Sequence, residues 1–128
     1  MKNKILTLFL TATLAAAALL LACGKEKEQA AECTFCHVEN PLTDLEWLKE
    51  IVEEINSIPL VPRSIYTCIY LSGTEGFIIS ECDNCPDAGE WLYDCSGNRL
   101  CLIGGLDGER GTAYDIDWDT KETIYRNY

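Results

Sequence analysis

Basic residues, histidine and methionine are scarce in this chain, and each shortage argues against certain ligands or cofactors. Ten lysines and arginines stand against 21 acidic residues, so the net charge is −11. A surface this acidic is repelled by phosphates and anionic lipid headgroups, which argues against nucleic-acid binding and against a polybasic membrane contact. The single histidine, His37, and the absence of methionine after Met1 restrict metal and haem ligation.

Signatures of hydrolases and nucleotide-binding enzymes are also missing. The sequence contains no Gly-x-Ser-x-Gly, no His-Glu-x-x-His and no Walker loop, and the glycine-rich run at 104–108 is interpreted as a turn. A nucleophile pair of Cys36 and His37 is disfavoured, because adjacent side chains in extended backbone point to opposite faces. We therefore expect no catalytic residue and no cofactor, and hence a protein that is not an enzyme.

One long apolar run is present, at residues 5–22, behind a basic start. This arrangement is typical of a secretory signal peptide, and the Leu-Leu-Ala sequence directly before Cys23 resembles the lipobox of bacterial lipoproteins. The alternative is a permanent signal anchor, since the run is about as long as the shortest membrane-spanning helices. Both interpretations place the rest of the chain outside the cytoplasm.

The lipobox resemblance implies cleavage before Cys23 and lipidation of this cysteine with a diacylglycerol and an amide-linked acyl chain. Each buried methylene contributes about 0.8 kcal/mol, so several acyl chains hold a protein on a membrane. We expect a signal peptide at 1–22, a flexible lipidated tether at 23–32 and a single globular domain at 33–128. Cleavage removes two of the ten basic residues and no acidic one, which lowers the net charge from −11 to −13. The acyl anchor must then make the membrane contact alone.

Seven cysteines follow Cys23, and in an exported chain this density predicts a disulfide framework. Because seven is odd, three bridges would leave one thiol, and the sequence leaves the pairing open. The turn position of Cys95 makes a bridge to Cys82 or Cys85 the simplest expectation, which would tie the loop at 82–89 to the rest of the domain. The disulfide candidates are Cys33, Cys36, Cys68, Cys82, Cys85, Cys95 and Cys101.

The same cysteines allow two metal hypotheses. Cys33, Cys36 and His37 match Cys-x-x-Cys-His, the attachment signature of c-type haem, in which the thiols form thioethers and the histidine is an axial ligand. A haem or other redox protein is therefore the alternative function. Two Cys-x-x-Cys pairs, at 33–36 and 82–85, could also form a four-thiolate zinc site, although an oxidising compartment favours disulfides.

The acidic run at 115–119 suggests calcium, because alternate carboxylates can converge on one ion. An EF-hand would need glycine at Thr120 and glutamate at Arg126, and the sequence has neither. In a strand, the same pattern would place Ile116 and Trp118 in the core and the three aspartates in water.

Hydrophobic periodicity predicts one helix followed by strands. A capping box beginning at Thr43 predicts a helix to about Ile55, with apolar residues at helical spacing. Strands are predicted at 64–71, 77–81, 91–93, 99–103, 113–118 and 123–128, with a type I turn and glycine bulge at 94–97 and a turn at 119–121. The prediction is an α+β domain, with one amphipathic helix packed on an antiparallel sheet of about five to six strands, stabilised by disulfides.

Two stretches carry a resemblance to a family. Residues 40–49 read Asn-Pro-Leu-Thr-Asp-Leu-Glu-Trp-Leu-Lys, and residues 93–101 include Tyr-Asp-Cys-Ser-Gly-Asn and then Leu-Cys. They resemble a group of small Bacteroidota lipoproteins that share a helix beginning Asn-Pro-Leu-x-Asp-Leu-x-Trp-Leu-Lys. The resemblance covers most of the domain and implies an envelope lipoprotein with no catalytic residues.

The functional expectation is a non-enzymatic binding or structural module of the cell envelope, lipid-anchored on Cys23 at the outer membrane. Its partners are the membrane, through the acyl anchor, and a protein, peptide or glycan bound through the sheet edge and loops. Trp47 and Trp91 are the candidate contact residues if their rings are exposed.

Overall fold

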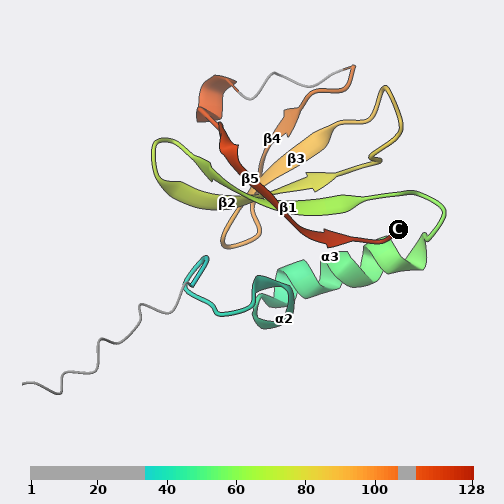
Figure 1. Ribbon diagram of the computed structural model, residues 1–128, viewed down its shortest axis with the longest axis horizontal. Helices are drawn as coiled ribbons and strands as arrows, with labels where there is room; N and C mark the ends of the chain where they lie inside the picture. The colour runs from blue at the N-terminus through green and yellow to red at the C-terminus, as the bar shows by residue number, and fades with distance from the viewer. Residues whose placement is uncertain (1–33, 107–111) are drawn as a thin grey trace, which may run out of the picture. The chain divides into compact units, whose positions relative to one another are not determined.

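A computed structural model describes residues 34–106 and 112–128 (Figure 1). The contacts within the chain divide it into Met1–Glu32 and Cys33–Tyr128, and the described residues all belong to the second unit. The expected signal peptide and tether, with Cys23, lie outside the described residues, as does Cys33. Within the described segments, no helix is long and apolar enough to span a membrane.

Five antiparallel strands form one open sheet in the order β4-β3-β2-β1-β5. A helix lies along one side of this sheet (Figure 1). The prediction of an α+β fold with an amphipathic helix on an antiparallel, disulfide-stabilised sheet is therefore confirmed. The strands are β1 (Ser64–Tyr70), β2 (Thr74–Ser80), β3 (Glu90–Asp94), β4 (Arg99–Ile103) and β5 (Asp117–Arg126), and the helices are α2 (Pro41–Asp44) and α3 (Glu46–Ser57).

The first helix starts earlier than the sequence predicted. Asn40 is the N-cap: its side-chain oxygen accepts a hydrogen bond from the Leu42 N–H at 3.2 Å, and its own N–H donates to Asp44 Oδ2 at 2.9 Å. The predicted cap at Thr43 is wrong, because Pro41 at the first helical position and asparagine before it make a stronger helix start. These two hydrogen bonds connect Asn40 to both ends of the single turn of α2.

The predicted apolar face of α3 is confirmed. Leu48 and Ile55 are fully buried, and they pack in one cluster with Ile65, Phe77 and Ile79 of the sheet. Burying a leucine, isoleucine or phenylalanine side chain stabilises the fold by roughly 1.5 to 3 kcal/mol relative to leaving it exposed. This helix-side core holds α3 on β1 and β2.

A second core lies on the opposite face of the sheet. It consists of alternate strand residues together with one residue of the segment before β5, namely Cys68, Tyr70, Ile78, Leu92, Ile103 and Ile116. Phe77, Ile78 and Ile79 therefore face alternately into the two cores, and β2 is buried on both sides. A continuous apolar run is the sequence pattern expected of such a strand.

An ion pair crosses this second face of the sheet. Lys121 of β5 binds both carboxylate oxygens of Glu90 on β3, at 2.8 and 3.0 Å, and its Nζ lies 4.0 Å from the ring centre of Tyr66. Because β2 and β1 lie between β3 and β5, this ion pair bridges two strands that are not neighbours in the sheet.

The C-terminal strand is one element, where the sequence predicted two strands about a turn at 119–121. β5 has ten residues and pairs with β1 through two register irregularities. Thr120 accounts for the continuity, because its Oγ1 accepts from the Ile69 N–H at 2.9 Å and donates to the Asp117 carbonyl at 2.6 Å. This hydroxyl thus pairs backbone groups that the bulge would otherwise leave open. A short 3-10 helix, η2 (Thr112–Tyr114), occupies part of the strand predicted at 113–118.

Candidate functional site

The segment that suggested haem forms a tight turn. Phe35 and Val38 exchange backbone hydrogen bonds of 3.1 and 3.2 Å around Cys36 and His37. These two turn residues have φ of 54° and 64°. Two-residue hairpin turns of this kind favour Asn-Gly, and a side chain in the left-handed region costs roughly 1 to 2 kcal/mol per residue. Other contacts must hold this turn in place.

A disulfide and a carboxylate supply those contacts. Cys36 is bonded to Cys95, at a sequence separation of 59. The Cys36 N–H donates to Glu75 Oε2 at 2.7 Å, and the Phe35 ring meets the Phe77 ring edge-on with centroids 5.3 Å apart. The turn is thereby fixed to β2 and to the hairpin between β3 and β4.

That hairpin has the predicted type I turn with a glycine bulge. The Gly97 N–H donates to the Asp94 carbonyl at 3.1 Å, and Gly97 has φ of 86°. Burial raises the pKa of Asp94, but hydrogen bonds from Asn98, Ser96 and Gly97 lower it more, and the net pKa lies below its ordinary value. Asp94 is thus an ionised turn-forming residue.

The cysteine geometry bears on the metal hypotheses. In this structure the Cys36 sulfur is part of a disulfide, so a haem thioether there would require the bond to open. Cys36 is bonded to Cys95, whereas Cys82 is bonded to Cys85, so the two Cys-x-x-Cys pairs do not meet as a four-thiolate site. His37 is exposed at the rim of a cavity of about 550 Å³ that Cys95 also lines. The grouping of Cys36, Cys95 and Glu75 contains no thiolate, because both sulfurs are in the disulfide.

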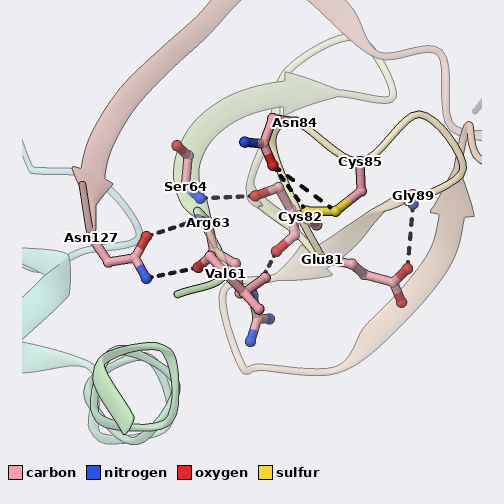
Figure 2. Close-up of a disulfide and its surroundings, with 10 residues drawn as sticks. Val61, Arg63, Ser64, Glu81, Cys82, Asn84, Cys85, Gly89 and Asn127 are labelled. Atoms are coloured by element: carbon pink, nitrogen blue, oxygen red, sulfur yellow. Dashed lines mark hydrogen bonds between the residues drawn. A yellow bond between two sulfur atoms is a disulfide. The ribbon is translucent and has the colours of Figure 1, made fainter. Parts of the chain in front are cut away.

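The second disulfide closes a local loop between β2 and β3. Figure 2 shows the Cys82–Cys85 bridge with the Asn84 side chain turned toward it; Asn84 Oδ1 lies 3.4 Å from the Cys82 sulfur. On the same loop, the Glu81 carboxylate accepts from the Gly89 N–H at 3.3 Å. The bridge therefore links two residues of the same loop and does not connect the loop to another element.

The expected bridge from Cys95 to Cys82 or Cys85 is wrong. The loop that contains Cys82 and Cys85 precedes β3, whereas Cys95 follows it. The five residues of β3 separate the two ends of the strand by about 17 Å. Cys95 instead lies at the end of the sheet where the Cys36 turn is docked.

Cys68 and Cys101 both lie with the second core. Cys68 on β1 is a free thiol with 1% of its surface exposed. Burial raises the pKa of Cys68 to about 11, and the positive charge of Lys121 acts in the opposite direction. Cys101 on β4 is half-buried. Cys68 is thus a protonated core residue at neutral pH rather than a nucleophile.

The acidic run before and within β5 is spread over the surface. Asp115, Asp117 and Asp119 are all exposed, and Ile116 is buried as predicted. Trp118 is 48% exposed, so the prediction that it lies in the core is wrong. Ile116 lies outside the strand, which begins at Asp117, so the strand alternation on which that prediction depended does not extend from Ile116 to Trp118.

Charged and aromatic side chains meet between α3 and the uncovered part of the sheet. They enclose a cavity of about 280 Å³, which we term the helix–sheet groove; its lining residues are Glu54, Arg63, Ile79, Glu81, Trp91, Tyr93 and Arg99. The Arg99 guanidinium carbon lies 4.5 Å from the Trp91 ring centre, and Arg99 Nε donates to the Tyr93 hydroxyl at 3.2 Å. Stacking and the hydrogen bond fix the orientation of this guanidinium.

Carboxylates hold the other polar groups of the groove. The Trp91 indole N–H donates to Glu81 Oε1 at 2.8 Å. Arg63 forms an ion pair with Glu54 at 3.3 Å, and its Nε donates to the Ser80 carbonyl at 2.9 Å. The groove is therefore built from positioned side chains of α3, β2, β3 and β4, of the segment before β1 and of the loop after β2.

The two candidate tryptophans have different roles. Trp47 is half-buried: its ring stacks on Tyr93 with centroids 5.7 Å apart, and its indole N–H donates to the Cys95 carbonyl at 3.1 Å. Trp47 therefore holds α3 against the β3–β4 hairpin. Trp91 is half-buried and lines the groove, where a ligand can reach it.

Sequence reasoning singled out Trp91 but missed Arg99, Arg63 and Glu81. The hairpin prediction contained a usable signal for Arg99. Counting outward from the turn at 94–97 places Arg99 opposite Tyr93, the pairing that the structure has. Arg63 and Glu81 flank the strands in loops and give no sequence signal.

We compared the chain with protein families, curated proteins and solved structures. No protein-family model, curated protein or solved structure matches the chain.

The two disulfides should stabilise the domain unequally. Chain-entropy estimates give about 4 kcal/mol for a loop closed at a separation of 59 and about 2 kcal/mol for one closed at 3. We predict that replacing Cys36 and Cys95 together by serine lowers the melting temperature roughly twice as much as replacing Cys82 and Cys85 together. Thermal unfolding followed by circular dichroism measures both decreases in melting temperature. Equal decreases would contradict the larger stabilisation assigned to Cys36–Cys95.

Cys68 should resist alkylation in the folded protein. Its thiol is buried and has a pKa of about 11, whereas alkylation requires the thiolate, which attacks iodoacetamide and displaces iodide. We predict that native protein at pH 8 shows no modified Cys68 by peptide mass analysis and that denatured protein shows complete modification. Fast modification of the native protein would show that this face of the sheet opens readily.

Proposed function

We propose that this chain is a lipid-anchored protein of a bacterial cell envelope whose domain binds a ligand without transforming it. The apolar run at 5–22 and the lipobox-like sequence before Cys23 support export and anchoring. Disulfides at Cys36–Cys95 and Cys82–Cys85 agree with an oxidising compartment. The anchor holds the domain at the outer membrane.

The helix–sheet groove is the observation that carries the binding proposal. Ligand sites combine a concave surface with a few positioned polar groups, and here the indole of Trp91 and the guanidinium of Arg99 are both held by neighbours. Such held groups lose little side-chain entropy when a ligand binds. The arrangement suits recognition.

The charge of the domain restricts the partner. A net charge of −11 for the chain disfavours nucleic acid and anionic lipid headgroups. The partner is therefore a protein, a peptide or a glycan, and the acyl anchor on Cys23 accounts for the membrane contact.

Lipidation of Cys23 is directly testable. Cells grown with labelled palmitate should label the wild-type protein, because acyl chains are attached at this cysteine. The Cys23→Ala variant should remain unlabelled, either as an uncleaved precursor or as released protein, as judged by autoradiography of membrane and soluble fractions. Label that persists in the variant would refute the anchor.

If the groove binds the ligand, a charge reversal in its wall should abolish binding, and the same change at a neighbouring residue outside it should not. Glu54→Lys reverses a wall charge and breaks the ion pair with Arg63, whereas Glu53→Lys makes the same change at an exposed neighbour that does not line the groove. Full-length wild type and Glu53→Lys should retain an envelope component from detergent-solubilised membranes that Glu54→Lys loses. Mass spectrometry of the eluted material identifies it.

Two results would contradict this proposal. One is equal retention by the wild type and both variants, which would place binding elsewhere on the chain. The other is a retained component whose mass changes during incubation with the wild-type protein, which would make the chain an enzyme.

A further inference from the structure

Arg99 differs from the other cation of the groove because it has no carboxylate partner. Arg63 is paired with Glu54, whereas Arg99 forms no ion pair with any carboxylate of the described residues. Its Nε donates a hydrogen bond to the Tyr93 hydroxyl, and the Trp91 ring covers one face of its guanidinium. The two terminal nitrogens of an exposed, oriented guanidinium therefore stay available in an otherwise acidic protein.

We infer that the helix–sheet groove captures the C-terminal carboxylate of a peptide on Arg99; this inference rests on the proposed binding function. A guanidinium presents parallel N–H donors that match both oxygens of a carboxylate. Trp91 and Tyr93 hold the guanidinium of Arg99 in one orientation before the ligand binds. The remaining walls then determine what is attached to the carboxylate.

The walls favour a singly charged ligand that also carries N–H donors. Glu81 and Glu54 line the same cavity as Arg99. Each carboxylate oxygen has two lone pairs, so both groups can accept hydrogen bonds beyond those they make to Trp91, Gly89 and Arg63. A dianion such as phosphate would be repelled by these carboxylates, whereas peptide amides would donate to them.

The aromatic geometry favours a peptide over a sugar. Sugar rings pack their C–H groups on open aromatic faces. Arg99 covers one face of the Trp91 ring, and the ring also packs against the helix-side core. A carboxylate needs no open ring. The volume of about 280 Å³ accommodates one or two residues at the end of a peptide.

The test compares matched peptides on full-length protein in detergent micelles. The probes are acetylated tripeptides with a free C-terminal carboxylate and the same peptides as C-terminal amides, pooled over the last residue. The readouts are the NMR signals of the Trp91 indole N–H and the Arg99 Nε–H, assigned with Trp91→Phe and Arg99→Gln. The acids should shift both signals and bind at least tenfold more tightly than the amides.

A second arginine provides the control variant. Arg126 also lies near an aromatic ring, 5.9 Å from the ring centre of Tyr128, and also lacks an ion pair within the described residues. Arg99→Gln should weaken binding of the acid peptides at least tenfold, as followed on the Trp91 signal, whereas Arg126→Gln should leave it unchanged. The dispersed amide spectrum of each variant reports that it is folded.

Each other outcome overturns the inference. Equal binding of acids and amides, or an unchanged affinity in Arg99→Gln, would show that no carboxylate is read by this residue. Shifts caused by glucuronate but by no peptide would assign the groove to an acidic sugar. Absence of shifts with every probe would reject the carboxylate site, while the Glu54→Lys capture result decides separately whether the groove binds anything.

Discussion

Burial of the central strand β2 on both faces is the constraint on which the architecture depends. Phe77 and Ile79 point to one side and Ile78 to the other, so each face needs its own cover. The amphipathic helix α3 covers the first. On the second, Tyr114 and Ile116 of the segment before β5 pack against the strand residues, and Lys121 of β5 bridges to Glu90 of β3. The two faces of β2 are thus covered by different parts of the chain.

The helix covers only part of its face, and this incomplete cover produces the groove. Trp47 and the Cys36–Cys95 disulfide fix the start of α3 and the turn before it to the β3–β4 hairpin. Trp91 and Arg99 remain beside the helix, where they line the helix–sheet groove, and Trp91 also packs on the edge of the helix-side core. The Cys36–Cys95 disulfide thus acts structurally, because it ties the turn before the helices to the hairpin that carries Trp91 and Arg99.

The candidate site was only partly predictable. Trp91 is a candidate contact residue from its residue type alone, and the turn at 94–97 sets the register that places Arg99 near it. The roles of Trp47 and Trp91 could not be separated from sequence, because both are tryptophans on partly polar elements. Which ring is covered depends on where the helix crosses the sheet.

The sequence by itself determined the α+β class, the apolar face of α3, the hairpin at 94–97 and the cysteine-rich, acidic character of the chain, because these follow from local spacing and composition. Only the tertiary structure decided that Cys36 pairs with Cys95, that β5 continues through Thr120, and that Trp47 packs on Tyr93 while Trp91 lines the groove. These contacts join residues that are distant in sequence. Their proximity is set by how the strands pair and where the helix docks, which no local pattern encodes.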